Sequence, residues 1–199
     1  ADCDIVGNVN QAQSNAELCN LIASTLVNCG LKKDQFIINV SNRKIIKGLI
    51  EDLKIPEEKQ IKVMRAIDKL DKPGFGLKGV EDLLKKERKD KSGAVTKGAN
   101  LNDEQASQII NFLKIKDLKE MKENFKNPLT QEGINEIEQL YEILSYGDYS
   151  EQIKTNFTIV RGLAYYDGFC VETNIKFKIT NNKGKEVDIG SICSGGQYN

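Results

Sequence analysis

The spacing of apolar residues changes twice along this chain of 199 residues, and these changes constrain the fold more than any other feature. The first part mixes helical and alternating spacing, a long middle part keeps helical spacing, and the last part alternates. Helical spacing buries one face of a helix, whereas alternation buries one face of a strand. We therefore predict an α/β chain in which an all-helical domain is inserted into a sheet domain.

The first part contains signals for a helix, a strand and a second helix. Residues 14–17 (SNAE) form a capping box, and the apolar residues that follow keep helical spacing until Gly30, which predicts a helix over this stretch. The segment 36–40 (FIINV) is short and β-branched and predicts a strand. The run at 44–53 (KIIKGLIEDL) predicts the next helix.

The middle part predicts four helices separated by polar segments. They cover 61–70, 80–87, a stretch from Asn102 to Leu113, and a stretch from Pro128 to Gly147 that Thr130 is expected to cap. The stretch 89–102 is polar and contains glycine, which favours an exposed loop. We place the domain boundaries at 1–46, 47–151 and 152–199, with the helical domain in the middle.

The last part predicts a hairpin. Ile175, Phe177 and Ile179 alternate with polar residues, and so do Val187 and Ile189, on the two sides of the polar turn 180–186.

Composition narrows the possible chemistry. The chain contains no histidine, which excludes Ser-His-Asp and Cys-His nucleophilic sites and most catalytic zinc sites from these residues. The five cysteines are scattered and form no CxxC pair, so we expect reduced, mostly buried thiols and no metal bound by the protein. Arg, Tyr and carboxylate side chains are left as candidates for chemistry.

Charge and hydropathy favour a soluble protein. The 29 basic residues balance the 29 acidic ones, so the whole molecule supplies no steering field for a nucleic acid. No segment reaches the roughly 18 uninterrupted apolar residues of a membrane span, and the first residues do not resemble a signal peptide. We therefore expect a cytoplasmic protein without a membrane partner.

A local basic stretch and a tyrosine-containing stretch are the candidate sites. Between residues 72 and 97, eight basic residues stand against four acidic ones, which suits either a solvated helix face or weak contacts with phosphates. In the segment 159–172 (IVRGLAYYDGFCVE), Arg161 could clamp a phosphate or a carboxylate, and Tyr165 and Tyr166 could orient a polar ligand. On the pattern alone, a purely structural interpretation of this segment is favoured.

Three segments resemble histidyl-tRNA synthetases. Residues 161–168 (RGLAYYDG), with Glu172 in the next strand, resemble the first histidine-specific signature of that family. The ending at 190–199 (GSICSGGQYN) resembles the second signature, and the opening at 1–7 (ADCDIVG) resembles the strand that follows motif 2 of class II synthetases. The middle part resembles the insertion domain of the family, so the resemblance covers essentially the whole chain.

The resemblance implies a fold, a reaction and a set of site residues. The fold would be part of a class II antiparallel sheet with a helical insertion domain. The reaction would be ATP-dependent formation of histidyl-adenylate followed by transfer to tRNA, with Mg²⁺ accompanying ATP. Arg161 would be catalytic and would bind the α-phosphate of ATP. The histidine-binding residues would be Asp4, Tyr165, Tyr166, Gly195, Gly196 and Tyr198, with Asp4 favoured over Asp2 and paired with Tyr166.

The resemblance also implies partners and a larger protein. The insertion domain would approach the acceptor stem of histidine tRNA, and the parent protein would be a homodimer. The phosphate-binding arginines of motifs 2 and 3 are not among these residues, so we expect the chain to be an internal piece that does not form histidyl-adenylate alone.

The match departs from the family pattern at three positions. Gln197 stands where the family usually has arginine, Asn199 where it usually has aspartate, and Ala164 where aspartate is frequent. The first two changes sustain one alternative, a synthetase-like regulatory or histidine-binding subunit without ligase activity. Another alternative is a helical RNA-binding module in which the sheet is only a scaffold.

Overall fold

A four-stranded sheet forms the centre of the computed structural model, which describes residues 1–7, 9–72, 74–89, 95–160, 165–182, 184–187 and 189–198. The strand order is β4 (Ile153–Thr155), β1 (Phe36–Asn42), β5 (Tyr166–Ile175) and β8 (Ser191–Tyr198). β1 runs parallel to β4 and antiparallel to β5, and β5 runs antiparallel to β8. The prediction of a mixed α/β fold with a mainly antiparallel sheet is confirmed.

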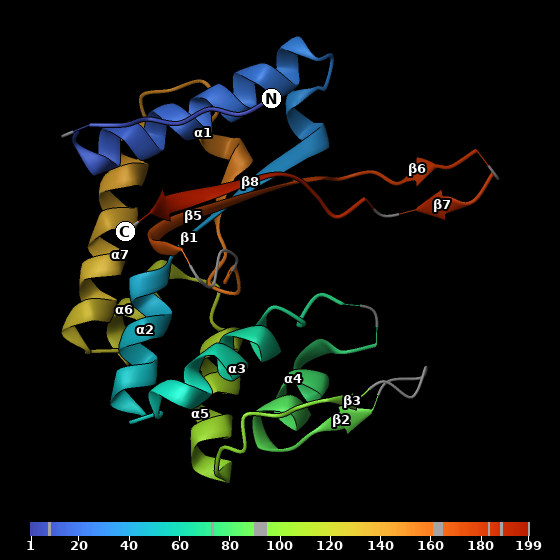
Figure 1. Ribbon diagram of the computed structural model, residues 1–199. Helices are drawn as coiled ribbons and strands as arrows, with labels where there is room; N and C mark the ends of the chain where they lie inside the picture. The colour runs from blue at the N-terminus through green and yellow to red at the C-terminus, as the bar shows by residue number, and fades with distance from the viewer. Residues whose placement is uncertain are drawn as a thin grey trace.

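Two helices cover one face of this sheet. Figure 1 shows α1 (Gln11–Asn28) lying along the sheet, with α7 (Pro128–Leu144) crossing near one end of it. Alternate residues of the central strands point into the core beneath these helices. This sheet core contains Phe36, Ile38, Val40, Phe169 and Val171 from the strands, Ala16, Cys19 and Ala23 from α1, and Ile137, Leu140 and Leu144 from α7.

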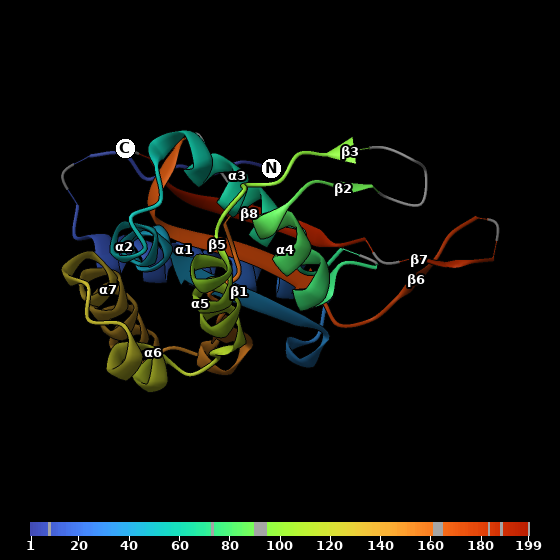
Figure 2. The ribbon, with the colours of Figure 1, turned by 90° about the horizontal axis from the view of Figure 1, so that it is seen from below.

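The remaining helices lie on the opposite side of the sheet, as Figures 1 and 2 both show. They are α2 (Arg43–Asp52), α3 (Glu57–Ile67), α4 (Gly76–Lys85), α5 (Asp103–Lys114) and α6 (Leu118–Asn124). Their apolar faces meet in a second core, the helical core, whose fully buried members include Leu49, Val63, Leu84, Ile109 and Phe112. Two short 3-10 turns, Lys33–Gln35 and Ser150–Gln152, lead into β1 and β4.

Most of the predicted helices are confirmed, but two of their caps are not where the sequence suggested. α1 begins at Gln11, because the side chain of Asn10 accepts a hydrogen bond from the Gln13 N–H; Ser14 lies inside the helix. In α7 the capping residue is Asn127. Thr130 is fully buried within that helix, and its Oγ1 donates to the carbonyl oxygen of Ile45 at 3.1 Å.

Two further segments differ from the prediction. The stretch 89–102 is not simply an exposed loop: β2 (Arg88–Lys89) pairs with β3 (Val95–Thr96), and Ala99 and Leu101 are buried against α4. Their N–H groups donate to the carbonyl oxygens of Leu83 and Leu84. The sequence prediction also missed α6, which is short and is capped by Asp117.

The predicted hairpin is confirmed, although it is shorter than expected. β6 (Ile179–Thr180) pairs with β7 (Glu186–Val187), with Ile179 opposite Val187. Ile175 belongs to the long strand β5 instead, while Phe177 and Ile189 lie outside the strands and are exposed. Figure 1 shows this hairpin projecting away from the body of the molecule.

The five cysteines are free thiols. Cys19 and Cys170 are buried as expected, whereas Cys3 and Cys29 are exposed. The predicted domain boundaries remain a prediction. α2 begins just before the first of them, and α7 contributes Ile134 to the helical core and Ile137 to the sheet core.

Candidate functional site

Three tyrosine rings meet at one end of β5 and β8. Tyr166 at the start of β5 lies opposite Tyr198 at the end of β8, and their ring centroids are 5.2 Å apart. Tyr165 stacks on Tyr198 at 5.9 Å and meets the edge of Tyr166 at 4.6 Å. Tyr165 and Tyr198 are 52% and 61% exposed, so this tyrosine cluster is open to the solvent. Such a surface combines apolar area with polar handles for a small ligand.

Glycine at position 196 makes room for the cluster. A Cβ atom built on Gly196 would lie 2.7 Å from the ring of Tyr166, so that a larger residue would displace the ring. A Cβ built on Gly195 would make only an ordinary contact, 3.6 Å from Val171. The geometry therefore requires glycine at position 196 more strictly than at 195.

The hydroxyl of Tyr166 is held in its neutral form. Burial, then a hydrogen bond with the Tyr198 hydroxyl and the proximity of Tyr198 and Tyr165, together raise the pKa of Tyr166 to about 12. At neutral pH this phenol can donate or accept a hydrogen bond but does not act as a base. The arrangement suits recognition of a polar ligand.

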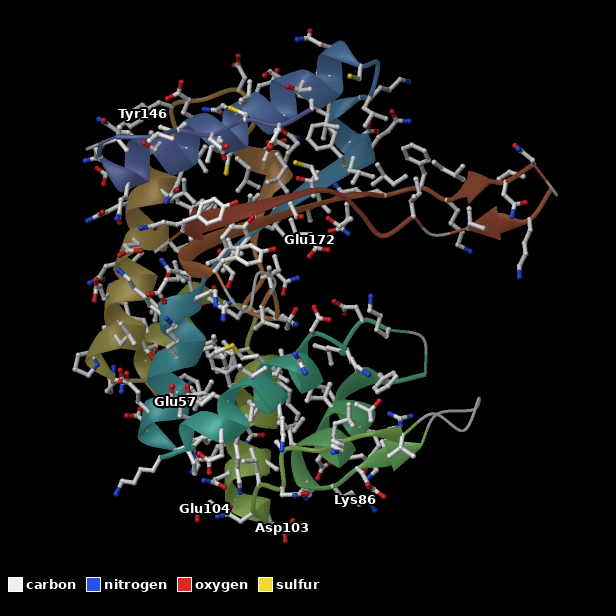
Figure 3. The ribbon with its side chains drawn as sticks, in the orientation of Figure 1. Glu57, Lys86, Asp103, Glu104, Tyr146 and Glu172 are labelled. Carbon is white, nitrogen blue, oxygen red and sulfur yellow. The ribbon has the colours of Figure 1, made fainter. Side chains whose placement is uncertain are left out.

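A polar pocket lies farther along the same strands, between the sheet and the end of α3. Its volume is about 340 Å³, and its lining includes Asn39, Asp68, Lys72, Glu172 and Asn174. The Asn39 Nδ2 donates to Asn174 Oδ1 at 3.0 Å, and Asn174 Nδ2 donates to Glu172 Oε1 at 3.5 Å. Figure 3 shows Glu172 on the side of β5 that faces α3. Glu172 of the first signature therefore belongs to this pocket.

Arg43 is a buried charge that the sequence prediction missed. It begins α2, is 2% exposed, and its Nη2 donates to the Met64 sulfur at 3.0 Å. Burial lowers the pKa of Arg43 and raises the pKa of the neighbouring Cys170 thiol to about 11. Nothing in the local pattern distinguished Arg43 from the exposed basic residues around it, because its burial depends on how α2 packs against β5.

The remaining predicted site residues are either exposed or outside the described residues. Arg161 and Ala164 of the first signature and Asn199 of the second lie outside the described residues. Asp4 is exposed in the segment before α1, where residues 1–7 form neither a helix nor the strand that the resemblance implied, and no hydrogen bond or ion pair joins it to Tyr166 in the described part of the chain. The start of the chain lies near Cys193 on β8. Burial raises the pKa of the Cys193 thiol, and the positive charge of the nearby Ala1 ammonium counteracts part of this rise.

Part of the basic stretch between residues 72 and 97 is already paired within the molecule. Lys85 forms ion pairs with Glu81 at 2.8 Å and with Asp103 at 2.9 Å. The Arg88 guanidinium stacks on Phe75 at 4.3 Å and donates to the carbonyl oxygen of Gly74.

The described residues contain neither a candidate metal cluster nor a helix that could span a membrane. No group of three or more His, Cys, Asp or Glu side chains is arranged to hold a metal ion there. None of the helices in the described ranges is long and apolar enough to cross a membrane.

Comparison with known proteins identifies the family. The family model described as histidyl-tRNA synthetase matches residues 4–199. Histidine–tRNA ligase of Pelagibacter ubique (strain HTCC1062) is 82% identical over 198 residues, which cover 100% of this chain and 43% of that protein. Histidine–tRNA ligase of Rhizobium rhizogenes is 38% identical over 207 residues, covering 99% of this chain and 40% of the relative. The chain thus spans less than half the length of these relatives.

Solved structures with a similar fold were also found. Histidyl-tRNA synthetase from Nostoc sp. PCC 7120 superposes with a TM-score of 0.70 at 25% identity, covering 96% of this chain and 41% of that one. A Bacillus halodurans protein described as an ATP phosphoribosyltransferase regulatory subunit/histidyl-tRNA synthetase has the same TM-score at 19% identity, over 96% of this chain and 44% of its own, which shows a shared fold. The family match over residues 4–199, together with the identity to the two ligases, shows that this chain belongs to the histidyl-tRNA synthetase family.

Proposed function

We propose that this chain is part of a histidine–tRNA ligase, which activates histidine with ATP to histidyl-adenylate and transfers the histidyl group to tRNA. The observation that carries the proposal is the tyrosine cluster. Two signatures separated by a hairpin in the sequence meet there, so that Tyr165 and Tyr166 from the first touch Tyr198 from the second. The 82% identity to a histidine–tRNA ligase supports the same assignment.

In this proposal the tyrosine cluster and its glycines bind histidine. The neutral hydroxyl of Tyr166 can exchange hydrogen bonds with the imidazole or the α-ammonium of histidine, and Gly196 leaves room for the ring that carries this hydroxyl. Asp4 supplies a carboxylate that accepts from the same donors. Tyr165, Tyr198 and Gly195 complete the histidine-binding set.

Arg161 would act on the phosphate in this mechanism. The histidine carboxylate attacks the α-phosphorus of ATP, and pyrophosphate leaves. A guanidinium at Arg161 would stabilise the charge that develops on the α-phosphate, without any protein general base. Mg²⁺ would arrive with ATP as part of that substrate.

Several further properties belong to the proposal. The helices between 47 and 151 would form the insertion domain and approach the acceptor stem of histidine tRNA, with exposed lysines between 72 and 97 contacting phosphates. The ligase would be a homodimer and would work in the cytoplasm, where its tRNA is used.

Histidine-dependent ATP–pyrophosphate exchange tests the proposal. The complete ligase that contains these residues should catalyse exchange with histidine and not with other amino acids, and it should then charge histidine tRNA. The 199-residue chain alone should show no exchange above a control without protein. Absence of histidine-dependent exchange by the complete protein would contradict the proposal.

Two residues and one structural neighbour support an alternative function. Gln197 and Asn199 depart from the second signature, and a structural neighbour carries both a regulatory-subunit and a synthetase description. In that case the chain would belong to a synthetase-like subunit that binds histidine without activating it. Histidine binding by the complete protein, measured by calorimetry, together with no exchange would support this alternative.

A further inference from the structure

We propose that Cys170 is a positioning residue for histidine binding: its side chain packs beside the Tyr166 ring, on the same face of the sheet, and holds this ring in the place that histidine meets. The link to histidine rests on the proposed function. The placement of the ring rests on the packing of β5, β8 and α2 alone.

Cys170 and the Tyr166 ring lie on the same face of the sheet. Cys170 of β5 pairs with Gly196 of β8. Residues that are directly opposite in an antiparallel pair point their Cβ atoms to the same face, about 5 Å apart. A Cβ built on Gly196 would lie 2.7 Å from both Cγ and Cδ2 of Tyr166. The ring therefore occupies the space toward which Gly196 would point a side chain, and Cys170 flanks that space.

The thiol of Cys170 points back along β5 toward Tyr166. The register of β5 and β8 shifts between these two residues, so that β5 bulges over residues 167–169. A bulge bends its strand and changes the direction of nearby side chains. The Sγ of Cys170 donates to the carbonyl oxygen of Gly168 inside this bulge, at 3.7 Å. Cys170 thus contacts the backbone that leads directly to Tyr166.

Arg43 at the start of α2 lies on another side of Cys170. The two side chains are buried, and α2 packs against β5. Burial raises the pKa of the Cys170 thiol, and the nearby positive charge of Arg43 counteracts part of this rise. After burial and the neighbouring tyrosines, Cys170 also contributes to the raised pKa of Tyr166, which agrees with a thiol close to both groups.

The side chain of Cys170 is therefore enclosed between the bulge, the Tyr166 ring and a buried group of α2. Removing its sulfur would leave a space beside the ring, and the ring would lose contacts that limit its position. The Gly168 carbonyl would also lose its hydrogen bond from the thiol. A ring that moves into this space would carry its hydroxyl away from the proposed histidine site.

Two variants and one control separate this role from ordinary core packing. Cys170→Ala removes the sulfur, whereas Cys170→Ser keeps a side chain of similar size that can donate to the Gly168 carbonyl. The matched control is Cys19→Ala, because Cys19 is also a fully buried thiol but lies on α1 in the sheet core, on the opposite face of the sheet.

Kinetics and spectroscopy provide the measurements. In the complete ligase, kcat and KM for histidine are measured by pyrophosphate exchange, and Tm by thermal unfolding. Near-ultraviolet circular dichroism of the 199-residue chain, which contains six tyrosines and no tryptophan, reports how firmly the tyrosine rings are held in the two Cys170 variants.

Both alanine variants should lower Tm, because each leaves a space in a packed interior. Only Cys170→Ala should raise KM for histidine, by about tenfold and with a smaller change in kcat. It should also weaken the tyrosine dichroism, while Cys170→Ser should stay close to the parent in KM and dichroism.

An unaltered KM in Cys170→Ala would overturn the proposal. So would an equal rise of KM in Cys19→Ala, or a loss in Cys170→Ser as large as that in Cys170→Ala. If the parent ligase shows no histidine-dependent exchange, the proposed function fails instead. The dichroism of Cys170→Ala, compared with that of the parent and of Cys170→Ser, then decides whether Cys170 positions the ring.

Discussion

The phenol of Tyr166 lies over Gly196 and meets the rings of Tyr165 and Tyr198 edge to face, and these neighbours control its chemistry. A phenolate here would be poorly solvated and would lie beside two further phenols. The neutral form is therefore favoured, and the hydroxyl remains a hydrogen-bonding group over the physiological pH range. Individual residues of this site act through such local contacts.

Tyr166 should ionise at a higher pH than an ordinary tyrosine. Its pKa is about 12 in the folded chain against an ordinary value of 10.0, so its contribution to the free energy of unfolding is complete below pH 10 and is lost as the pH rises toward 12. When tyrosinate absorbance is followed against pH, the late component, which is the part that appears at the highest pH, should be missing in Tyr166→Phe. Burial also raises the pKa of Tyr141, so the difference between variant and parent is the relevant quantity.

The matched control for this titration is Tyr146→Phe. Tyr146 is 88% exposed, at the edge of the molecule in Figure 3, and its removal should leave the contribution of Tyr166 unchanged. An unchanged late component in Tyr166→Phe would show that the cluster does not hold this hydroxyl neutral.

Asp4→Asn in the complete ligase should weaken histidine binding, because the change removes an anionic acceptor while keeping the shape of the side chain. We expect KM for histidine to rise by about tenfold or more, as for loss of a charged hydrogen bond. Asp2→Asn, two residues away, is the control and should leave KM unchanged. If instead Asp4→Asn lowers Tm and leaves KM as it was, Asp4 has a structural role.

Arg161→Lys in the complete ligase should slow adenylate formation far more than it weakens histidine binding. Lysine keeps the positive charge but loses the planar, two-pronged donor of arginine. We expect a loss of about a hundredfold or more in the rate, comparable to removal of one preorganised donor from an oxyanion site. Single-turnover adenylate formation measures this directly, and a rate within a few-fold of the parent would argue for the regulatory-subunit alternative.

At the scale of elements, the close crossing of α2 and α7 depends on glycine. A Cβ built on Gly48 of α2 would lie 2.2 Å from Oγ1 of Thr130 on α7, and one built on Gly133 of α7 would lie 2.9 Å from Ile45 on α2. The hydrogen bond from Thr130 to the Ile45 carbonyl crosses the same contact. This crossing connects the helix that follows β1 with the helix that packs against the sheet.

Gly48→Ala should destabilise the chain by about 1–3 kcal/mol, because overpacking at the crossing outweighs the gain of up to about 1 kcal/mol from the better helix propensity of alanine. Urea unfolding followed by far-ultraviolet circular dichroism measures the change. Gly147→Ala is the control, because the nearest atom to its new Cβ is 3.4 Å away. A stability equal to or above that of the parent would mean that α2 and α7 can separate without cost.

At the scale of the whole molecule, α7 joins the two cores. Ile134 is buried in the helical core, while Ile137, Leu140 and Leu144 are buried in the sheet core. One continuous helix thus contributes to both, and α2 contacts both α7 and β5. Loss of packing in one core therefore propagates to the other through a rigid element.

Unfolding of the chain should consequently be a single transition. Far-ultraviolet dichroism of the helices and near-ultraviolet dichroism of the tyrosines should give the same midpoint in urea. Leu140→Ala should lower both midpoints together, with a cost of about 2–5 kcal/mol for a buried leucine. Leu21→Ala, at a position that is 41% exposed on α1, should have a much smaller effect. Two separated midpoints would show that the cores unfold independently.

The sequence by itself determined which segments are helical and which are extended. The helix after Asn102, the helix after Pro128, the strand at 36–40 and the hairpin around 180–186 were all predicted from their spacing. Spacing reports which face of an element is buried, and this is a local property of the chain. The two signatures likewise indicated the tyrosines of the candidate site before any contact was known.

Only the tertiary structure decided which buried faces meet and which polar groups they enclose. The burial of Arg43 and Thr130 and the glycine contacts at positions 48 and 196 all involve residues distant in the sequence. Caps and short elements such as α6, a helix of 7 residues, were also missed, because so few residues do not show a period. The spacing of apolar residues does not show which element packs against a buried face, because the pairing of faces depends on the combined packing of all elements.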